Sequence, residues 1–215
     1  MKKYTNNISY YDNSRPDVLK HIPHDVKKVL DVGCGTGALG LSIKSQLGTR
    51  IEVVGIELDY QAGKIAKSRI DDIIIGNVEN INIPYENNYF DCIIYADILE
   101  HLIDPWELLI KHKLKLADNG NIIASIPNIG HYKIIKMLKR GSWKYEDEGI
   151  LDRTHLRFFT KNTILNMFIQ SGLTPLIIDK ILVGNEYWRL KHKLFNIDSC
   201  VAQFIVKAQK KIYKQ

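Results

Sequence analysis

The chain has 215 residues, of which 45% are hydrophobic and 25% charged, with a formal net charge of +6 and a pI near 9.0. This length fits one domain with a sizeable core, and no apolar run is long enough for a membrane span. The segment Met1–Asp12 has no apolar stretch of the kind found in signal peptides. These features favour a cytoplasmic globular protein and argue against a membrane-spanning or secreted one.

The positive charge is modest and gathers in two segments, Lys133–Lys144 and Lys207–Lys214. Solvated lysine faces explain such segments best, so we expect no nucleic acid partner, while a peripheral membrane contact stays open. The three cysteines, Cys34, Cys92 and Cys200, form no CxxC pair and no Cys/His cluster with zinc spacing. We expect them to be buried reduced thiols, the last two within strands.

Short β-branched runs alternate with helical patterns along the chain, which is typical of a parallel sheet. The expected strands are, in order, Val29–Val32, Ile51–Ile56, Ile73–Ile75, Phe90–Ala96, Asn121–Ile126, Leu176–Val183 and Cys200–Val206. The expected helices are Ala38–Leu47, Gln61–Arg69, Pro105–Ala117 and Lys161–Gln170. The pattern predicts a single α/β domain over residues 1–215, with a doubly wound, Rossmann-like, seven-stranded sheet, mostly parallel with a C-terminal antiparallel hairpin.

A segment over about residues 129–160 interrupts this alternation and is rich in basic and aromatic residues. It follows the fifth strand, on the side where parallel strands end and ligands bind. The segment is therefore either an inserted substrate cap or a basic surface helix. Within it, Asp152, Arg153 and Arg157 either orient a polar, hydroxyl-rich substrate or pair with one another. A later basic and aromatic stretch, Tyr187–Phe195, either touches a membrane or partner or packs at the domain edge.

The strongest local signal is the run Asp31–Gly37, with the sequence DVGCGTG, directly after the first strand. Its glycines allow a tight turn and close approach of a ligand to the backbone. The helix that follows offers free N–H groups and the positive end of its dipole. Twenty residues past Gly37, Glu57 ends the second strand, where a carboxylate can accept hydrogen bonds from ribose hydroxyls. These features predict a nucleoside-containing cofactor.

Two cofactors fit this pattern, because Gly33, Gly35 and Ala38 also satisfy the GxGxxG/A spacing of NAD sites. Asp31, however, would place a negative charge beside a pyrophosphate. S-adenosylmethionine (SAM) instead offers a cationic amino group and sulfonium there. The run Gly76–Val78 offers an amide and an apolar side chain for adenine, although Asn77 is also a common turn residue. Both details favour SAM.

These residues lie in runs that resemble known motifs. VLDVGCGTGALG, VVGIELD, IIIGNVEN and FDCIIYADILEHL resemble four successive motifs of class I SAM-dependent methyltransferases. The stretch Tyr10–Asp179 is similar to a bacterial family often found beside sugar and cell-surface glycan genes. The shared features are Tyr10-Tyr11, Arg15-Pro16, Ser125–Asn128 with His131, and Leu151–Thr160. One departure is Asn77, where the family usually has Asp; its amide can still bond adenine.

The resemblance implies a set of cofactor contacts. The methionine end of SAM would lie against Asp31, Gly33 and Gly35, and the ribose against Glu57. The residues implied around the rest of the cofactor, from adenine to the methyl group, are Leu58, Asn77, Val78, Asp97 and Ile98. The resemblance also implies an N-terminal lid over about residues 1–25, which would include Tyr11 and Arg15.

Methyl transfer is an in-line displacement, so the protein mainly aligns the reacting groups, and a hydroxyl acceptor also needs a base. Three histidines are candidates: His101 beyond the fourth strand, His155 in the cap segment and His131 after the fifth strand. Each could instead be held for structure. Asp97, Glu100 and His101 could alternatively bind a divalent metal, as is suspected of quinone-type O-methyltransferases, but such short spacing on a turn argues against it and we expect no metal.

The sequence therefore predicts a SAM-dependent methyltransferase acting at oxygen on a small-molecule or sugar/glycan-precursor acceptor. Methylation of a protein or lipid-linked acceptor is a rival enzymatic interpretation. A non-catalytic SAM-binding module in a biosynthetic complex is another, and an NAD-dependent dehydrogenase a third, against which Asp31 argues. Oligomeric state is not readable from the sequence, because exposed apolar surface is not visible in it.

Overall fold

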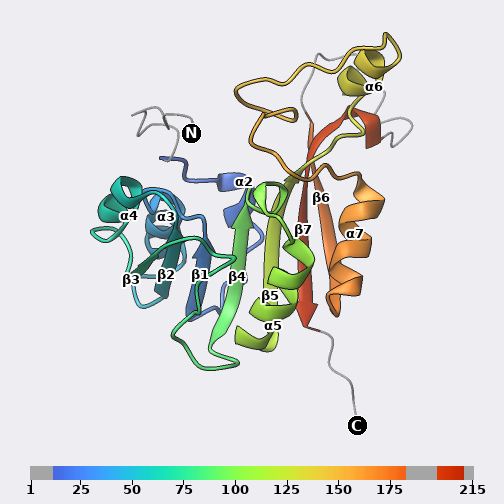
Figure 1. Cartoon of the computed structure of the whole chain (residues 1–215). Helices are drawn as coiled ribbons and strands as arrows, with labels where there is room; N and C mark the ends of the chain where they lie inside the picture. The colour runs from blue at the N-terminus through green and yellow to red at the C-terminus, as the bar shows by residue number, and fades with distance from the viewer. Residues whose placement is uncertain (1–11, 183–197, 211–215) are drawn as a thin grey trace.

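The computed structural model describes residues 12–182 and 198–210. These residues form one seven-stranded sheet with the order β3-β2-β1-β4-β5-β7-β6 (Figure 1). The strands are β1 (Lys28–Val32), β2 (Glu52–Glu57), β3 (Asp72–Ile75), β4 (Phe90–Ala96), β5 (Leu116–Pro127), β6 (Leu173–Leu182) and β7 (Val201–Lys210). The helices are α2 (Pro16–Leu19), α3 (Ala38–Leu47), α4 (Tyr60–Ala66), α5 (Pro105–Lys115), α6 (Tyr132–Leu138) and α7 (Lys161–Gln170), with 3₁₀ turns η1 (Leu99–His101) and η2 (Asp198–Cys200).

The strand pairing confirms the predicted fold. β1, β2, β3, β4 and β5 pair in parallel, whereas β7 inserts antiparallel between β5 and β6. Several element boundaries differ from the prediction by a few residues, including the two that follow. β5 begins at Leu116, because Leu116 pairs with Phe90 ahead of an exposed turn in which Asn119 has a φ of 63°. Cys200 lies in η2 and not in a strand, although all three cysteines are buried and free as expected.

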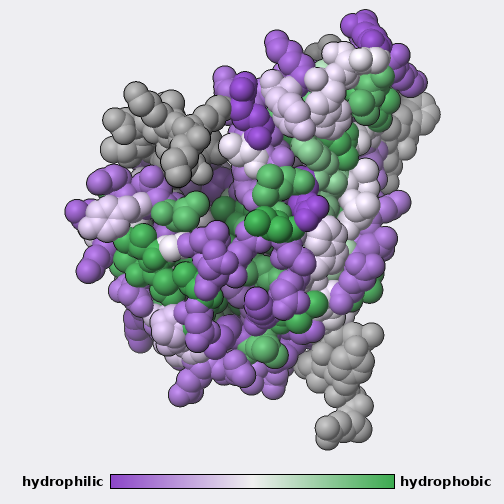
Figure 2. All heavy atoms as spheres, viewed as in Figure 1, coloured by the Kyte–Doolittle hydropathy of each residue, from purple (hydrophilic) through white to green (hydrophobic). Residues whose placement is uncertain are grey.

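Each face of the sheet is covered by helices, as a doubly wound fold requires. One core cluster joins the sheet to α5 and α7, through residues such as Leu109 and Phe168. The other joins the opposite face to α2, α3 and α4, through residues such as Val18, Ile43 and Ala66. On the molecular surface, hydrophilic residues cover much of the face shown in Figure 2. Among the described residues, no helix combines the length and apolar character needed to cross a bilayer.

The strand order reverses between β1 and β4, and this reversal positions the site. In open α/β sheets ligands bind beyond the carboxyl ends of the strands at such a reversal. The segment that carries α6 extends beyond that end of the sheet in Figure 1, and α2 lies near the same end. The chain therefore places both its N-terminal segment and the predicted cap where a ligand would sit.

Replacing Phe204 by Ala is expected to destabilise the protein by about 3–5 kcal/mol, because it leaves a cavity in a close-packed core. Phe204 is fully buried in β7, where it pairs with Ile126 on one side and Lys180 on the other. Urea unfolding followed by circular dichroism measures the loss. Thr174→Ala at an exposed position of β6 is the control and should stay within about 0.5 kcal/mol of wild type. An equally small effect of Phe204→Ala would contradict the packing described here.

Candidate functional site

A cavity of about 690 Å³, the larger cavity, lies at the carboxyl ends of β1, β2 and β4. Its lining includes every predicted cofactor residue except Tyr11, which lies outside the described residues. These are Arg15, Asp31, Gly33, Gly35, Glu57, Leu58, Asn77, Val78, Asp97 and Ile98. Residues from separate strands and loops therefore converge on one space, as the sequence motifs predict.

The glycine turn between β1 and α3 is shaped by backbone contacts. The N–H groups of Gly33 and Cys34 both donate to the carbonyl of Ile56, at 2.8 and 3.1 Å. Gly33 has a φ of 73°, and a Cβ built on it would lie 2.0 Å from Cδ1 of Ile98. Only glycine combines that backbone conformation with so close a neighbour. The turn thus brings bare backbone to the wall of the larger cavity.

Glu57 anchors this turn to β2. One carboxylate oxygen accepts from the N–H of Gly35 and the other from the N–H of Asp59, each at 2.8 Å. Burial raises the pKa of Glu57, and the hydrogen bonds from these backbone amides oppose that rise. Glu57 therefore holds the glycine turn in place in addition to the ribose contact predicted for it.

Asp31 is the most unusual group in the larger cavity. It is 2% exposed, and its Oδ2 makes no hydrogen bond within the described residues. Burial raises its pKa to about 7, and the nearby charge of Glu57 adds to the rise. A buried carboxylate oxygen without a partner is costly, and a cationic ligand group would relieve that cost. The cavity thus fits the amino group of SAM and not the pyrophosphate of NAD.

Asn77 is a turn residue in the structure, which was one of the two interpretations that the sequence left open. Its Oδ1 accepts from the N–H of Glu79 at 2.9 Å and closes the turn after β3. Leu58 and Val78 lie on the same wall of the larger cavity, and Leu58 is 60% exposed. An exposed leucine side chain beside a cavity suits the face of a planar ring, so this wall is compatible with the predicted adenine site.

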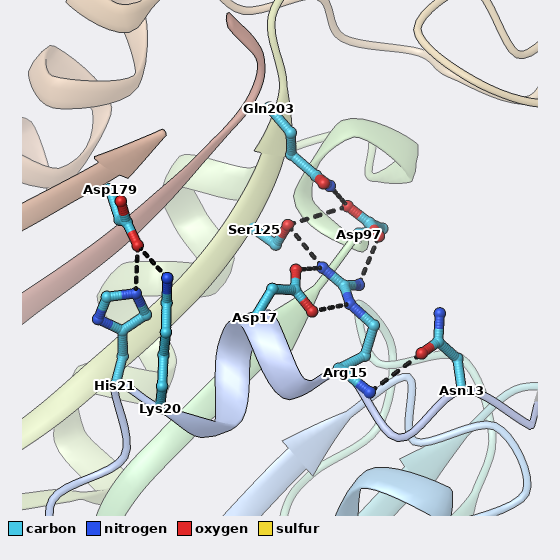
Figure 3. A network of polar contacts seen from close by, with 9 residues as sticks. All are labelled: Asn13, Arg15, Asp17, Lys20, His21, Asp97, Ser125, Asp179 and Gln203. Atoms are coloured by element: carbon cyan, nitrogen blue, oxygen red, sulfur yellow. Dashed lines mark hydrogen bonds and ion pairs between the residues drawn. The ribbon is translucent and has the colours of Figure 1, made fainter. Parts of the chain in front are cut away.

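A partly buried ion-pair network joins α2 and the residues before it to the sheet (Figure 3). Arg15 donates to Asp97 at 2.5 Å, to Ser125 Oγ at 2.8 Å and to Asp17 at 2.9 and 3.1 Å. Gln203 of β7 donates to Asp97 from the other side. Burial opposes the charge of Arg15, but the hydrogen bond and attraction of Asp17 and the attraction of Asp97 raise its pKa. Asp97 is therefore held from both sides.

A second contact fixes the other end of α2. Lys20 and His21 approach the same oxygen of Asp179 in β6, at 2.5 and 3.1 Å (Figure 3). Together with Arg15, these residues tie the described part of the predicted lid to the sheet. Sequence reasoning missed Asp17 and Gln203 as parts of this site. Ser125 lies in one of the sequence motifs that carry the family resemblance. The contact of Gln203 depends on the register of β7 against β5, for which the sequence carries no signal.

A cavity of about 310 Å³, the smaller cavity, lies beside the larger one, and Asp97 and His101 line both. Its other lining residues come from η1, β5, β7 and the cap segment: Glu100, Pro127, Glu148, Gly149, Ile150, Asp152, His155, Ala202 and Gln203. Glu148 is exposed, so the smaller cavity reaches solvent. We call the region around His101, where the two cavities meet, the junction.

The structure brings two of the three candidate histidines together. The rings of His101 and His155 are 4.7 Å apart between centroids and meet edge to face. Burial lowers the pKa of His101, and the neighbouring His155 lowers it further. His131 lines neither cavity, since it is buried at the start of α6, where its Nδ1 accepts from the N–H of Lys133 at 3.4 Å. Its position suits a helix cap better than a base.

Glu100 is more prominent in the structure than in the sequence. It is 1% exposed, and neither carboxylate oxygen makes a hydrogen bond within the described residues. Burial raises its pKa well above the usual range, and the charge of Asp97 adds to this. Its backbone carbonyl accepts from the N–H groups of Leu156 and Arg157, each at 2.9 Å, and so docks the cap segment onto η1.

Arg153 and Arg157 of the cap segment make structural contacts that leave them outside both cavities. Arg153 pairs with Asp147 at 2.9 Å, and Nε of Arg157 donates to the carbonyl of Ile103 at 3.1 Å. Neither side chain lines either cavity. The three residues singled out in this segment thus do not pair with one another as the sequence alternative had it: Arg153 pairs with Asp147, and Arg157 fastens the cap segment to the backbone after η1. The stretch Tyr187–Phe195 lies outside the described residues.

Comparisons with known proteins agree with this geometry. A family model described as a methyltransferase domain matches residues 9–177. The chain is 22% identical over 185 residues to the demethylmenaquinone methyltransferase of Staphylococcus epidermidis, covering 77% of this chain and 76% of that protein. It is 30% identical over 146 residues to the ubiquinone biosynthesis O-methyltransferase of Pasteurella multocida, covering 56% and 58%. A SAM dependent methyltransferase from Aquifex aeolicus shares the fold, with a TM-score of 0.66 at 16% identity over 98% of this chain and 100% of that chain.

Proposed function

The chain belongs to the methyltransferase domain family, whose model matches most of it, and on this premise we propose that it transfers a methyl group from SAM to a hydroxyl oxygen of a small, hydroxyl-rich acceptor such as a sugar or glycan precursor. The observation that carries the proposal is the junction. Two cavities of about 690 and 310 Å³ share Asp97 and His101, so a cofactor in one can face an acceptor in the other.

The residues of the larger cavity support the cofactor assignment. Asp31 offers a buried carboxylate oxygen that has no hydrogen-bond partner among the described residues to a cationic group. Glu57 lies at the end of β2 with its charge already partly satisfied by backbone amides. SAM, when bound, supplies a methyl group on a cationic sulfur. The protein contributes alignment, and fixing two reactants in a near-attack geometry can lower the barrier by roughly 7–11 kcal/mol.

The residues of the smaller cavity support a hydroxyl-rich acceptor. Among the described residues, its polar lining includes the carboxyl groups of Glu100, Glu148 and Asp152, and no lysine or arginine. Carboxyl groups accept hydrogen bonds from hydroxyls, and those that are ionised repel phosphates and carboxylates. Its volume lies near the lower end for small-molecule pockets, which suits a single ring better than a protein segment.

The chemistry at the junction is a balanced displacement. The acceptor oxygen forms a bond to the methyl carbon while the carbon–sulfur bond breaks, and its electron pair passes to sulfur to give S-adenosylhomocysteine. The hydroxyl proton must leave as this bond forms. His101 lines both cavities and has a lowered pKa, so it is neutral at pH 7 and able to assist the removal of that proton.

Isothermal titration with SAM, S-adenosylhomocysteine and NAD tests the cofactor. Wild type should bind the two adenosyl sulfur compounds saturably, and Glu57→Ala should weaken that binding at least about 100-fold, since it removes the ribose acceptor and releases the glycine turn. Glu107→Ala on the exposed face of α5 is the control and should bind as wild type does. Binding of NAD alone would overturn the proposal.

Incubation with methyl-labelled SAM and a panel of sugars, nucleotide sugars and phenols then tests the acceptor. Labelled product and S-adenosylhomocysteine formed with neutral sugars would support the proposal. Transfer to phenols alone would move the acceptor toward the quinone precursors suggested by the names of the relatives. Saturable SAM binding without turnover on any small molecule, peptide or lipid-linked acceptor would instead favour the non-catalytic module.

A further inference from the structure

Glu100, His101 and His155 form a compact group of potential metal ligands at the junction. One ligand atom from each residue lies within 4.8 Å of the others. Glu100 and His101 come from η1, whereas His155 comes from the cap segment, which docks through the backbone of Glu100. A metal ion holds nitrogen and oxygen ligands at about 2.1 Å, so small side-chain rotations would bring all three to one ion.

The two imidazole rings are oriented as metal ligands usually are. Nδ1 of His101 lies 3.3 Å from the carbonyl oxygen of Thr154, and Nδ1 of His155 lies 3.1 Å from that of Ile150. A carbonyl only accepts, and the Thr154 hydroxyl, 3.2 Å from Nδ1 of His101, donates its own proton to Asp152 at 2.6 Å. These contacts are therefore satisfied when Nδ1 of each ring carries the proton. Nε2 of each ring then has a free lone pair, and within the described residues it makes no hydrogen bond. Metal-binding histidines almost always have this second contact.

Glu100 supplies an independent observation. It is 1% exposed, lines the smaller cavity, and leaves both carboxylate oxygens without a hydrogen bond in the described parts of the chain. A buried carboxyl group in this state is costly unless a cation or a donor reaches it. Arg15 does not neutralise Glu100, because its guanidinium group is already paired with Asp17 and Asp97.

We propose that Glu100, His101 and His155 bind a divalent transition-metal cation of the Zn²⁺ type at the junction. One carboxylate with two neutral imidazoles is a donor set of borderline softness, and three protein ligands leave a position open for another group. The site differs from the metal alternative considered from the sequence, because Asp97 is held by Arg15, Ser125 and Gln203, and His155 takes its place.

The cation has a defined part in the reaction, and this part rests on the proposed function. An acceptor hydroxyl in the smaller cavity would fill the open position, and a divalent cation lowers the pKa of a bound hydroxyl. The proton then leaves to water through the solvent side of the cavity, near the exposed Glu148. In this arrangement His101 and His155 act as ligands that hold the cation, and the cation takes over the activation of the hydroxyl that His101 would perform in a metal-free site.

Titration with Co²⁺ tests the site on full-length protein without a histidine tag, after treatment with EDTA. Visible absorption of the bound ion reports coordination, and isothermal titration with Zn²⁺ reports affinity and stoichiometry. Wild type should bind one ion saturably. Glu100→Gln, which keeps the shape of the side chain, and His155→Ala should each weaken binding at least about 100-fold. His24→Asn, at an exposed histidine, is the matched control and should leave binding unchanged.

The outcomes separate this inference from the proposed function. Glu100 does not line the larger cavity, so Glu100→Gln should still bind SAM, which also shows that it folds. Equal Co²⁺ binding by wild type, Glu100→Gln and His155→Ala would overturn the metal site, and so would the absence of binding to wild type. Methyl transfer by a metal-free protein would leave the proposed function standing without the metal. Metal binding without any SAM binding would support the metal site and overturn the proposed function.

Discussion

Replacing Asp31 by Asn is expected to weaken SAM binding at least about 30-fold, because it removes a buried charge that faces the cationic end of the cofactor. The carboxylate is 2% exposed, and one of its oxygens has no hydrogen-bond partner in the described residues. Asn is nearly the same size, so the loss reports the charge and not the shape. Isothermal titration at pH 8 measures it, with Asp118→Asn at a mostly exposed position as the control. Unchanged affinity in Asp31→Asn would contradict the assigned role.

The same group makes cofactor binding depend on pH. Burial raises the pKa of Asp31 from about 3.8 to about 7, so a growing fraction of the side chain is protonated below neutrality. SAM binding by wild type should therefore strengthen between pH 6 and pH 8, and binding by Asp31→Asn should lose this dependence. Titrations across that range check the prediction, and a flat wild-type profile would argue against it.

The free protein should respond in the opposite sense. A carboxyl group whose pKa is raised on folding contributes stability below about pH 3.8, and this contribution is lost as the pH rises through about 7. At pH 8 the ionised group costs on the order of 4 kcal/mol relative to an exposed one. Asp31→Asn should thus have a higher Tm than wild type at pH 8 in the absence of ligand, while binding SAM more weakly. A residue that served only the fold would not give this combination.

The fold could be predicted from the sequence because its signals are local. A β-branched run such as Ile51–Ile56 followed by a helical pattern predicts a βαβ unit wherever it occurs, and the handedness of such units leaves few topologies. The residues at which strands begin and end were harder to predict from the sequence. β5 starts at Leu116 because of its pairing with Phe90, which lies on another strand, and no local pattern carries that information.

The candidate site also has a part that local sequence signals predict and a part that depends on long-range contacts. Asp31 and Glu57 lie at the ends of β1 and β2, and the glycines follow β1, so their convergence on the larger cavity could be predicted from strand order alone. The junction could not. His155 reaches His101 only because the cap segment docks on the backbone of Glu100, across a gap in sequence that neither propensity nor spacing describes. Long-range contacts of this kind need the tertiary structure.

The second large effect concerns the glycine turn itself. Gly33→Ala is expected to abolish measurable SAM binding, for two reasons that act together. The φ of 73° at this position is strained for any residue with a Cβ, and the added Cβ would lie 2.0 Å from Cδ1 and 2.7 Å from Cγ1 of Ile98. Ile98 lines the larger cavity, so either its side chain moves or the turn does, and both change the surface that the cofactor meets.

A matched variant separates the strain from the contact. Gly141 has a φ of 69°, close to that of Gly33, but a Cβ added there would meet no atom within 4 Å. Gly141→Ala should therefore cost only the backbone strain, roughly 1–2 kcal/mol of unfolding free energy, and should leave SAM binding intact. If Gly33→Ala bound SAM as well as Gly141→Ala does, neither the changed turn nor the displaced Ile98 side chain would affect the cofactor. The cofactor would then lie away from the turn between β1 and α3, and its assignment to the larger cavity would be wrong.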